Sequence, residues 1–533
     1  MDPDRARILA DLSGVLDGQI RCDDLFLQIY SSDASLYEIK PLAVVRPETL
    51  SDVVSVVKYA GENQISVIPR GSGSNVVGAS LGSGIVLDFS VGMRQILSVD
   101  RETVRVQPGV AIRDLNRQLQ SHQQIFSPDP ATRSVTTIGG ALAMNRTGSH
   151  WVSSGTPRDK IVQLQMVMAT GEVVRLDSVT NQALLTQKSK SETSEARVRE
   201  LKTRVGNVIR SNEKLIADSQ PETKINQAGY HLDSVMQSDK VDLTRLAIGS
   251  EGTLGIITEA VVRTDRISSH RGVAILFFHQ LQAAATAAVD IVKMGVTACD
   301  LMDRRLLTLA RETNETYQRL LPVDAEAMLL VEFDAEDDAS LREKLKHLTN
   351  RIQRRKKLAF EVRTTTQAME RNLYWHLVRR VVPSLYRLRG LRRAVPFIED
   401  IAIAPDRLPE FLKRVHEVLN DHDITASIFS HTPQGMVHIR PFLNLAEKKD
   451  IARMKPLAKA IFGLTLEMNG SISGSQGDGL GRTWFLRSQY GKLHPVFSEV
   501  KNIFDPQSVL NPGKIVGLPY SDLTDNLLSL IHI

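Results

Sequence analysis

The apolar positions of the N-terminal part follow two different periods. Residues 1–18 place Ile8, Leu9, Leu12 and Leu16 on one stripe, which predicts a short amphipathic helix. Between residues 41 and 100, glycine, serine and proline separate short apolar runs, which read VSVVKYA, ISVIP, GIVLDFS and RQILSVD. This pattern predicts strands around one helix at residues 50–63. A second cluster of the same kind spans residues 103–176.

The next segment changes from apolar to charged. Residues 181–220 are rich in charged side chains, poor in aromatic ones and helical in pattern, so we expect an exposed helical insertion outside the core. The stretch that follows at residues 246–262 is glycine-rich and strand-like, and it reads LAIGSEGTLGIITEAVV.

After about residue 265, long helical stretches alternate with strands. The helical stretches include QLQAAATAAVDIVKMG and SLREKLKHLTNRIQRRKK, and the strands include AMLLVEFD and VPFIEDIAIAP. This alternation predicts a second domain of the α+β class. From residue 482 the chain is helical again, and it then loops through LNPGKIVG up to residue 517.

Composition narrows the class of protein. The 533 residues are 42% hydrophobic and 24% charged, as in a soluble globular protein of two or three domains. A formal net charge of +5 on a chain of this length gives no reason to expect a nucleic-acid partner. The only cysteines, Cys22 and Cys299, lie far apart, which argues against a disulfide scaffold, a zinc–thiolate site and an iron–sulfur cluster.

The hydropathy pattern also bears on the compartment. The chain contains no run of about 18 apolar residues and opens without an apolar signal core. We therefore expect a cytoplasmic protein with no transmembrane segment. Peripheral association with the inner face of the membrane remains open.

The strongest chemical signal is a glycine-rich loop directly after the run ISVIP. It reads Arg70-Gly71-Ser72-Gly73-Ser74-Asn75-Val76-Val77-Gly78. Glycine allows the backbone to turn sharply and to approach a ligand closely, and successive exposed N–H groups form an anion-binding nest. The glycine spacing differs from G-x-G-x-x-G and no helix pattern follows directly, so we reject a Rossmann dinucleotide site.

A second glycine-containing segment follows. It contains Pro128-Asp129-Pro130, then Thr137-Ile138-Gly139-Gly140-Ala141-Leu142-Ala143-Met144-Asn145, and then Gly155-Thr156-Pro157-Arg158-Asp159. An isolated Gly-Gly pair is usually a plain turn. Two such loops, each after a strand, favour instead a site for the pyrophosphate and ribose of one nucleotide cofactor.

Several ordered motifs resemble a known family. They are the first loop, the TIGG segment, the Arg158-Asp159 pair, residues 248–258 (IGSEGTLGIIT) and residues 510–514 (LNPGK). Together they resemble the FAD-linked oxidases of the vanillyl-alcohol oxidase/p-cresol methylhydroxylase type, and within them D-lactate dehydrogenase and the glycolate oxidase flavin subunit. The resemblance covers roughly residues 20–517. It implies an α+β protein with a two-part FAD-binding domain of the p-cresol methylhydroxylase type and a ferredoxin-like α+β cap domain.

The patterns and the resemblance together give domain boundaries. We expect an N-terminal helix at 1–20, the FAD-binding domain at 21–265 with the helical insertion at about 181–220, and the substrate or cap domain at 266–480. A segment at 481–517 would return to the FAD domain, and residues 518–533 would form a tail.

The resemblance further implies which residues bind FAD. These are Arg70, Gly71, Ser72, Gly73, Ser74, Asn75, Gly78, Pro128, Asp129, Thr137, Gly139, Gly140, Asn145, Gly148, Arg158, Asp159, Glu251, Gly252, Gly255, Ile256, Ile257 and Asn511. Some members of the family tether FAD through a histidine beside the first glycine pair or through a nearby cysteine. Here Ser74 stands at the histidine position and neither cysteine lies in a flavin loop, so we expect non-covalent FAD.

A candidate substrate site lies in the segment SHTPQGMVHIRP, residues 430–441. In related 2-hydroxyacid dehydrogenases, two histidines at this separation resemble metal ligands, joined by the glutamate of a later S-G-E-H-G motif. A divalent metal would polarise the substrate hydroxyl and carboxylate while a histidine takes the hydroxyl proton. His431 and His438 are therefore candidates both for metal ligation and for catalysis. The alternative is that they are hydrogen-bonded residues without a catalytic role.

The later motif departs from the family pattern. It reads Ser473-Gly474-Ser475-Gln476-Gly477-Asp478, so Ser475 stands at the third ligand position and Gln476 at the histidine position. Serine is a poor metal ligand and glutamine cannot act as a general base, which weakens the case for a metal and makes His438 the better base candidate. Asp478 is an alternative carboxylate.

Arginines provide candidate anion-binding groups. Arg379 and Arg380 follow Tyr374-Trp375-His376 and resemble the family's W-x-x-R segment, so we expect Arg379 to bind the substrate carboxylate, with a solvated helix face as the alternative. A basic cluster, either solvated or docking an acidic redox partner, consists of Arg387, Arg389, Arg392 and Arg393. Glu399 and Asp400 lie in an apolar, strand-like run, and we expect one of them to pair with an arginine of this cluster.

These features predict an FAD-dependent dehydrogenase that oxidises a small 2-hydroxy acid, of the D-lactate or glycolate type, to the 2-oxo acid. The electrons would pass to a separate acceptor, which is an iron–sulfur protein, a quinone, a cytochrome or dioxygen. Two alternatives stay open. Ser475 and Gln476 are compatible with a catalytically altered flavin-binding subunit, and the flavin domain is also compatible with a transferase like the alkylglycerone-phosphate synthases.

Overall fold

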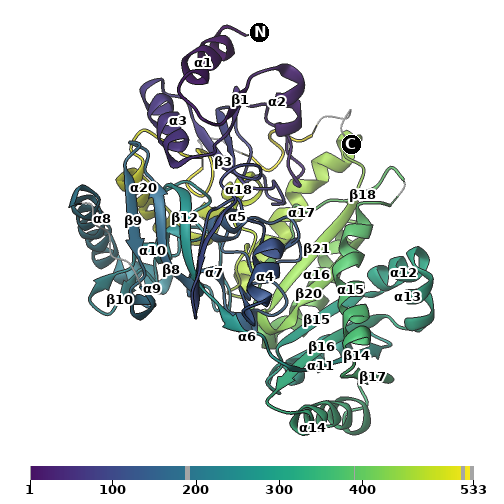
Figure 1. The fold of residues 1–533 in the computed structure, drawn as a ribbon. Coiled ribbons are helices and arrows are strands. Elements are labelled where there is room, and N and C mark those ends of the chain that lie inside the picture. Colours follow the sequence, from purple (N-terminus) through teal and green to yellow (C-terminus); the bar gives the residue numbers. More distant parts are fainter. Residues whose placement is uncertain (1, 186–191, 389, 518–521, 529–533) are drawn as a thin grey trace.

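The computed structural model describes residues 2–185, 192–388, 390–517 and 522–528. Strands from residues 19–266 form sheets on one side of the molecule, and strands from residues 270–443 form one large sheet on the other (Figure 1). This arrangement of two parts, both built from helices and strands, agrees with the predicted α+β class.

The N-terminal helices form where the sequence predicts them. Helix α1 (Pro3–Ser13) begins at Asp2, whose carboxylate accepts two backbone N–H groups, and it ends before Gly14, so it is shorter than the predicted 1–18. Helix α3 (Leu50–Glu62) matches the prediction of 50–63 within one residue. A capping box between Thr49 and Asp52 fixes its start because each side chain accepts the other's backbone N–H.

The first sheet brings the glycine loop to its edge. It has the order β1 (Gln19–Arg21), β2 (Ala43–Arg46), β4 (Ile85–Asp88) and β3 (Val67–Arg70). Strands β2, β4 and β3 are parallel, and β4 is buried along its whole length. The glycine loop therefore leaves the carboxyl end of β3, which is where α/β sheets bind their ligands.

The second sheet is antiparallel and is completed by a strand distant in sequence. Its order is β5 (Ile96–Val99), β6 (Thr103–Val106), β12 (Ile256–Arg263), β8 (Ile161–Val167) and β9 (Val173–Asp177). Two short pairs accompany it, β7 (Gln124–Ile125) with β13 (Asp265–Arg266) and β10 (Met236–Gln237) with β11 (Lys240–Val241). Short helices connect these strands: α2 (Asp24–Tyr30), α4 (Ile112–Gln120), α5 (Ile138–Ala143), α6 (Trp151–Ser154), α7 (Pro157–Lys160) and α9 (Glu213–Asp218).

The prediction of a strand over the whole of residues 246–262 was wrong in detail. The strand-like stretch 246–262 is the end of α10 (Leu243–Ala247), then a loop, and only from Ile256 a strand. The loop cannot pair as a strand because Gly249, Glu251 and Gly252 have positive φ angles.

The charged segment at 181–220 is helical, but the prediction that it lies outside the core was wrong. Helix α8 (Glu192–Ser211) buries Leu201, Val205, Val208 and Ile209 in the main core cluster, and it packs against α20 (His494–Phe504). Its apolar residues recur at intervals of three and four, which places them on one helix face despite the many charges between them.

The cap begins with a ferredoxin-like β-α-β-β-α-β unit. Its elements in chain order are β14 (His270–Phe278), α11 (Leu281–Val292), β15 (Ala298–Asp303), β16 (Ala327–Ala335), α14 (Asp338–Thr349) and β17 (Glu361–Thr365). In space the strands run β17-β14-β16-β15, and the sheet continues through β20 (Ala426–His431), β21 (Met436–Leu443) and β18 (Arg393–Ala394).

Both faces of the cap sheet are covered. Along β14, Ala274, Leu276 and Phe278 belong to the main core with α11, α14 and α16 (Leu408–Asp421). The alternate residues Val273, Ile275 and Phe277 belong to a second cluster with α12 (Arg304–Thr313), α13 (Glu315–Leu320) and α15 (Ala368–Leu385). This alternation is the period of two expected of a strand buried on both sides.

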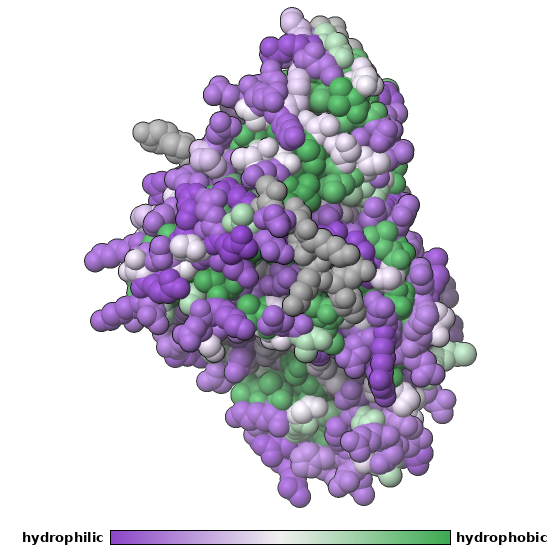
Figure 2. Space-filling model, turned by 60° about the vertical axis from the view of Figure 1, so that its left-hand side comes forward, coloured by the Kyte–Doolittle hydropathy of each residue, from purple (hydrophilic) through white to green (hydrophobic). Residues whose placement is uncertain are grey.

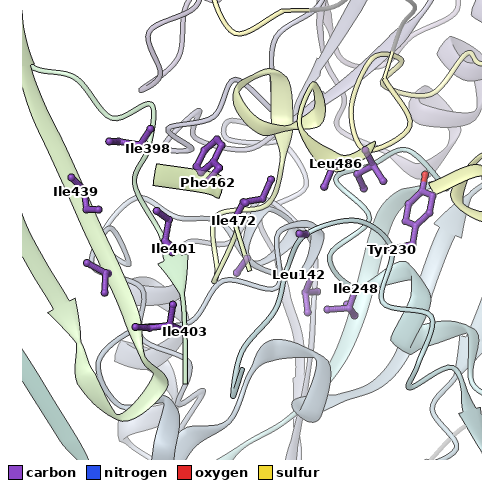
Figure 3. Packing of buried hydrophobic residues seen from close by; sticks show 14 of the residues in the cluster. Leu142, Tyr230, Ile248, Ile398, Ile401, Ile403, Ile439, Phe462, Ile472 and Leu486 are labelled. Atoms are coloured by element: carbon purple, nitrogen blue, oxygen red, sulfur yellow. The ribbon is translucent and has the colours of Figure 1, made fainter. Parts of the chain in front are cut away.

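The C-terminal elements connect the cap with the N-terminal part of residues 19–266, called the flavin part from here on. They comprise α17 (Lys448–Glu467), α18 (Gly479–Thr483), α19 (Leu486–Tyr490) and α20. Figure 3 shows Ile398, Ile401 and Phe462 packed in the same core that contains Leu142 and Ile248. The two parts therefore share one continuous core.

The predicted strand VPFIEDIAIAP is mostly irregular. Only β19 (Ile401–Ala402) pairs with β21, because Asp400 has a φ of 71° and turns the chain just before it. The surface seen in Figure 2 is mainly hydrophilic with scattered apolar patches. Within the part of the chain that the structure describes, no helix has the length and apolar character needed to span a bilayer.

Candidate flavin and substrate site

A cavity lies where the end of β3, helix α5 and the loop before β12 meet. It is lined by Pro69, Arg70, Gly71, Ser72, Gly73, Ser74, Asn75, Ala79, Ser80, Phe89, Pro108, Thr136, Thr137, Gly139, Gly140, Ala143, Met144, Arg146, Ser250, Glu251, Gly252, Gly255, Ile256 and Ile257. None of these lining residues is a histidine or a cysteine, the side-chain types that tether flavin in some relatives.

The glycine loop presents free donors to this cavity. Among the described residues, the backbone N–H groups of Ser72, Gly73, Ser74 and Asn75 donate to no protein acceptor. Arg70 lines the cavity, and two N–H groups of its guanidinium donate to the carbonyls of Tyr30 (3.2 Å) and Ser32 (2.9 Å). The loop thus presents a row of free backbone N–H groups to an anion, and the hydrogen bonds of Arg70 hold the start of the loop in position.

The cavity walls leave no room for side chains at two glycines. A Cβ atom on Gly71 would lie 2.3 Å from Oγ1 of Thr137, and one on Gly139 would lie 2.7 Å from Cβ of Pro108. The first glycine loop therefore packs directly on the start of α5, where Thr137 accepts the Gly140 N–H at 3.2 Å. The close approach of Thr137 requires glycine at position 71, and that of Pro108 requires glycine at position 139.

Other predicted FAD residues lie outside the cavity lining, namely Gly78, Pro128, Asp129, Asn145, Gly148, Arg158, Asp159 and Asn511. Several of them brace the walls. Asn145 accepts the Arg158 N–H at 2.9 Å, and the Arg158 guanidinium donates to the carbonyl of Ile248 at 2.7 Å. Asn511 donates to the carbonyls of Ala79 (2.9 Å) and Glu251 (2.7 Å). These contacts fix the positions of residues that do line the cavity.

Glu251 fastens the C-terminal segment to the cavity. Its carboxylate accepts the N–H groups of Asp478 (2.6 Å) and Gly479 (2.9 Å). Burial raises the pKa of Glu251, and burial together with the charge of Glu251 raises the pKa of Asp478. Asp478 accepts the Gly229 N–H at 2.7 Å, so it is engaged here and not with the histidines.

Arg146 was missed by the sequence analysis. It lines the cavity, is buried, and donates to the Ser74 carbonyl at 3.2 Å. Burial lowers its pKa, and the charges of Asp400 and Glu399 act in the opposite direction. The charges of these two carboxylates thus act on a cation that lines the cavity. Nothing in the local sequence marks it, because burial of an arginine depends on distant segments.

The two candidate histidines come together on adjacent strands. His431 ends β20 and His438 lies in β21, and their ring centroids are 5.4 Å apart. Nδ1 of His431 lies 2.7 Å from Asp300, which also accepts the Ser149 hydroxyl at 2.6 Å. Burial would lower the pKa of His431, but the Asp300 carboxylate outweighs it and raises that pKa.

His438 faces a buried carboxylate. Its Nδ1 lies 3.6 Å from Oε1 of Glu399, and Nη2 of Arg440 lies 2.7 Å from Oε2 of Glu399. Burial alone would raise the pKa of Glu399, but Arg440 and His438 hold it at about 2. Burial lowers the pKa of His438, so its imidazole is neutral around pH 7. The expected pairing of Glu399 with the basic cluster was wrong, since its partner is Arg440.

The third metal-ligand position is already engaged. Asp400 accepts the N–H of Ser475 (2.8 Å), its hydroxyl (3.2 Å) and the N–H of Gln476 (2.6 Å). Among the described residues, no group of three or more histidine, cysteine, aspartate or glutamate side chains is arranged to hold a metal ion. His431 and His438 thus lack the third donor, and this set of residues does not fit a divalent metal.

Arg379 lies near the second glycine segment. Nη2 is 3.9 Å from Asp129, and the guanidinium stacks 5.0 Å from the Trp375 ring centroid. Burial lowers its pKa to about 10, so it stays charged. Arg380 is exposed. In the basic cluster Arg387 and Arg392 are exposed and Arg393 is half-buried, whereas Arg389 lies outside the described residues.

A charged contact that the sequence did not reveal joins the flavin part to the cap. His150 contacts Asp129 (2.7 Å) through Nδ1 and Glu332 (3.1 Å) through Nε2. Trp375 also donates to Glu332, at 2.6 Å. Burial would lower the pKa of His150, but Asp129 and Glu332 raise it to about 10, so the ring is charged.

Comparison with known proteins agrees with this arrangement. The family "FAD binding domain" matches residues 41–177, and the family "FAD linked oxidases, C-terminal domain" matches residues 267–515. The crystal structure of p-cresol methylhydroxylase with substrate bound superposes with a TM-score of 0.68 at 14% identity, over 98% of this chain and 99% of that one. The chain belongs to the FAD-linked oxidases, and the cofactor for which its cavity is built is FAD.

Relatives in sequence extend over almost the whole chain. D-2-hydroxyglutarate dehydrogenase of Haemophilus influenzae is 27% identical over 91% of this chain but only 49% of its own length. Glycolate oxidase subunit GlcD of Bacillus subtilis is 28% identical over 91% of this chain and 92% of its own length. The chain thus spans about half the length of the D-2-hydroxyglutarate dehydrogenases that it matches, and nearly all of the glycolate oxidase subunit.

Proposed function

We propose that the protein is an FAD-dependent dehydrogenase that oxidises a small 2-hydroxy acid to the 2-oxo acid. The observation that carries this proposal is the buried imidazole of His438, which lies 3.6 Å from the Glu399 carboxylate and 5.4 Å, between ring centroids, from His431 on the neighbouring strand. The relatives named for 2-hydroxyglutarate, glycolate and D-lactate support the class of substrate.

Oxidation of a 2-hydroxy acid removes a hydride from the hydroxyl-bearing carbon and a proton from the hydroxyl. FAD, which we propose is held non-covalently, supplies the two-electron acceptor when bound. Nδ1 of His438 lies 3.6 Å from the Glu399 carboxylate, beyond hydrogen-bond distance, so the carboxylate acts on the imidazole through its charge. We propose that the imidazole of His438 takes the hydroxyl proton as the carbonyl group forms, and that the negative charge of Glu399 stabilises the protonated ring.

The chain length of the 2-hydroxy acid is part of what we propose. We propose an acid of the D-lactate or glycolate type, and the relatives named for 2-hydroxyglutarate make the longer dicarboxylic acid a necessary member of any substrate panel. Arg379, predicted to bind the substrate carboxylate, is charged and only loosely paired with Asp129, and it is a candidate for the second carboxylate of such a dicarboxylic acid.

We also propose that the electrons leave through a separate acceptor, an iron–sulfur protein or another redox carrier. The glycolate oxidase relative is named as a subunit, and some relatives are twice as long as this chain. The expected cytoplasmic location, with peripheral membrane association left open, stays a prediction.

Anaerobic bleaching of the bound flavin tests the proposal. Purified protein is reconstituted with FAD and mixed with glycolate, D-lactate, L-lactate and D-2-hydroxyglutarate, and the flavin absorbance is followed. Bleaching by one acid is expected. A flavoprotein that no acid bleaches is not this dehydrogenase, and a transferase or an altered subunit then becomes the better description. If a Ser475→Glu, Gln476→His double variant gained bleaching that the wild type lacks, the native site would be a degraded one.

A further inference from the structure

We propose that this site operates without a divalent metal and that Arg440 binds the carboxylate of the 2-hydroxy acid in its place. The inference rests on the proposed function, whose substrate it positions. Arg440 follows His438 by two residues in β21, so both side chains project from the same face of the strand. The Arg440 side chain is only 7% exposed and is held by Glu399 at 2.7 Å.

Unpartnered polar atoms gather around this arginine. Among the described residues, the buried atoms without a hydrogen-bond partner include Nε of Arg440, Oε2 of Glu399, Nδ1 of His438 and Oε1 of Gln476. Buried polar groups are nearly always hydrogen-bonded, so several unpartnered atoms in one cluster indicate the place of a polar ligand. The contact of Arg440 with Glu399 is an ion pair, and the Nε–H of Arg440 is a free donor beside it.

The local charges disfavour a metal ion. Each carboxylate around the histidines is already engaged, Asp300 with His431, Glu399 with Arg440 and Asp400 with the loop at 474–476. The guanidinium of Arg146 adds a second buried cation beside Glu399 and Asp400. A divalent cation at this place would be repelled by the charges of Arg440 and Arg146. The imidazoles of the two histidines would be its only available ligands among these side chains.

The same charges favour a carboxylate. A guanidinium presents its N–H groups in a fork that matches the two oxygens of a carboxylate. Side chains two residues apart on a strand are separated by about 7 Å at their Cα atoms. A 2-hydroxy acid carries its carboxylate and hydroxyl on neighbouring carbons, so Arg440 can hold the first while His438 faces the second.

Metal content and inhibitor binding test the inference without relying on turnover. The FAD-loaded protein is dialysed against EDTA, its zinc, manganese and iron are measured, and flavin reduction is compared before and after. Oxamate, an unreactive analogue of a 2-oxo acid, is titrated while the flavin absorbance is recorded. We expect substoichiometric metal, no effect of EDTA, and a spectral shift with oxamate.

Variants of Arg440 separate its role from folding. Arg440→Gln should weaken oxamate binding and raise KM by roughly 10- to 100-fold, the effect of losing a charge-assisted hydrogen bond. Arg440→Lys keeps the positive charge but loses the two parallel N–H donors of the guanidinium, so its oxamate affinity and KM should lie between those of the wild type and Arg440→Gln. Arg414→Gln is the matched control, since Arg414 pairs with Glu467 at the surface. Flavin content and melting temperature report whether each variant folds.

Two results would overturn the inference. One is a stoichiometric metal whose removal abolishes flavin reduction, and the other is unchanged oxamate affinity in a folded Arg440→Gln variant. Failure of the proposed function looks different. In that case no 2-hydroxy acid bleaches the wild-type flavin, whereas metal content and oxamate binding still report on Arg440.

Discussion

Nδ1 of His438 lies 3.6 Å from Oε1 of Glu399, and the two side chains are 7% and 1% exposed. At this distance the carboxylate acts on the imidazole through its charge and not through a hydrogen bond. Glu399 is ionised because the Arg440 guanidinium and His438 hold its pKa at about 2. The pair therefore places a neutral ring beside a buried negative charge, which stabilises the ring when it takes up a proton.

Replacing the imidazole should slow chemistry without releasing the cofactor. We expect His438→Gln to lower the rate of flavin reduction by on the order of 10²- to 10⁴-fold, the usual contribution of a general base, while FAD content stays normal. Stopped-flow measurement of flavin bleaching checks this. His416→Gln is the control because its ring contacts the carbonyl of Leu412, in its own helix. An unchanged bleaching rate in the His438 variant would exclude His438 as the base.

A methyl group on the glycine loop should prevent FAD binding. In Gly71→Ala the new Cβ would lie 2.3 Å from Oγ1 of Thr137, so the two loops that enclose the cavity must move apart. We expect a folded protein with little bound flavin, measured from the ratio of flavin to protein absorbance. Gly463→Ala in α17 is the matched control, since no atom lies within 4 Å of its new Cβ. Full flavin content in Gly71→Ala would show that these loops do not hold the cofactor.

Truncation of an α8 side chain tests whether that helix belongs to the core. Leu201 is fully buried, so Leu201→Ala should lower the free energy of unfolding by about 2–5 kcal/mol. Thr203→Ala on the exposed side of the same helix should change it by less than about 0.5 kcal/mol. Urea unfolding followed by far-UV circular dichroism gives both values. Equal effects of the two variants would favour a loosely attached insertion.

The charged contact of His150 should make stability fall in mild alkali. The pKa of His150 is about 10 in the folded state and near 6.5 when unfolded, so the folded state holds more protons between these values. Its contribution is complete below pH 6.5 and is lost as pH rises towards 10. Asp129 and Glu332, with pKa values lowered to about 2, contribute above their unfolded values and lose that contribution as pH falls towards 2.

The variant His150→Gln should remove the alkaline slope and lower the free energy of unfolding at neutral pH by up to about 3 kcal/mol, because Asp129 loses its nearest cation while Glu332 keeps Arg271. The free energy of unfolding is measured from pH 6 to pH 10 for both proteins. His270→Gln serves as the control, because His270 pairs with Asp338 near the surface. A parallel pH dependence in wild type and the His150 variant would contradict the assignment.

Local requirements of the backbone made much of the fold and the flavin site visible in the sequence. The glycine loop at 71–78, the TIGG segment and the strand runs each express a constraint that neighbouring residues satisfy by themselves, such as a positive φ or a period of two. The start of α3 is another case, since Thr49 and Asp52 cap it within one turn. The position of the cavity and the expectation of a nucleotide cofactor follow from such signals, whereas the class of fold and the identity of the cofactor as FAD were implied by the resemblance of the motifs to a known family.

Contacts between distant segments decided the rest. Asn75 donates to the carbonyl of Gln476 across 401 residues of sequence, and the Asp400 carboxylate accepts hydrogen bonds from a loop 75 residues further on. Whether Arg146, His150 and Arg440 are buried, and which carboxylate each one meets, depends on how the cap folds back onto the flavin part. The energy of a buried charge is set by its surroundings in space, and a sequence pattern describes only the neighbours along the chain.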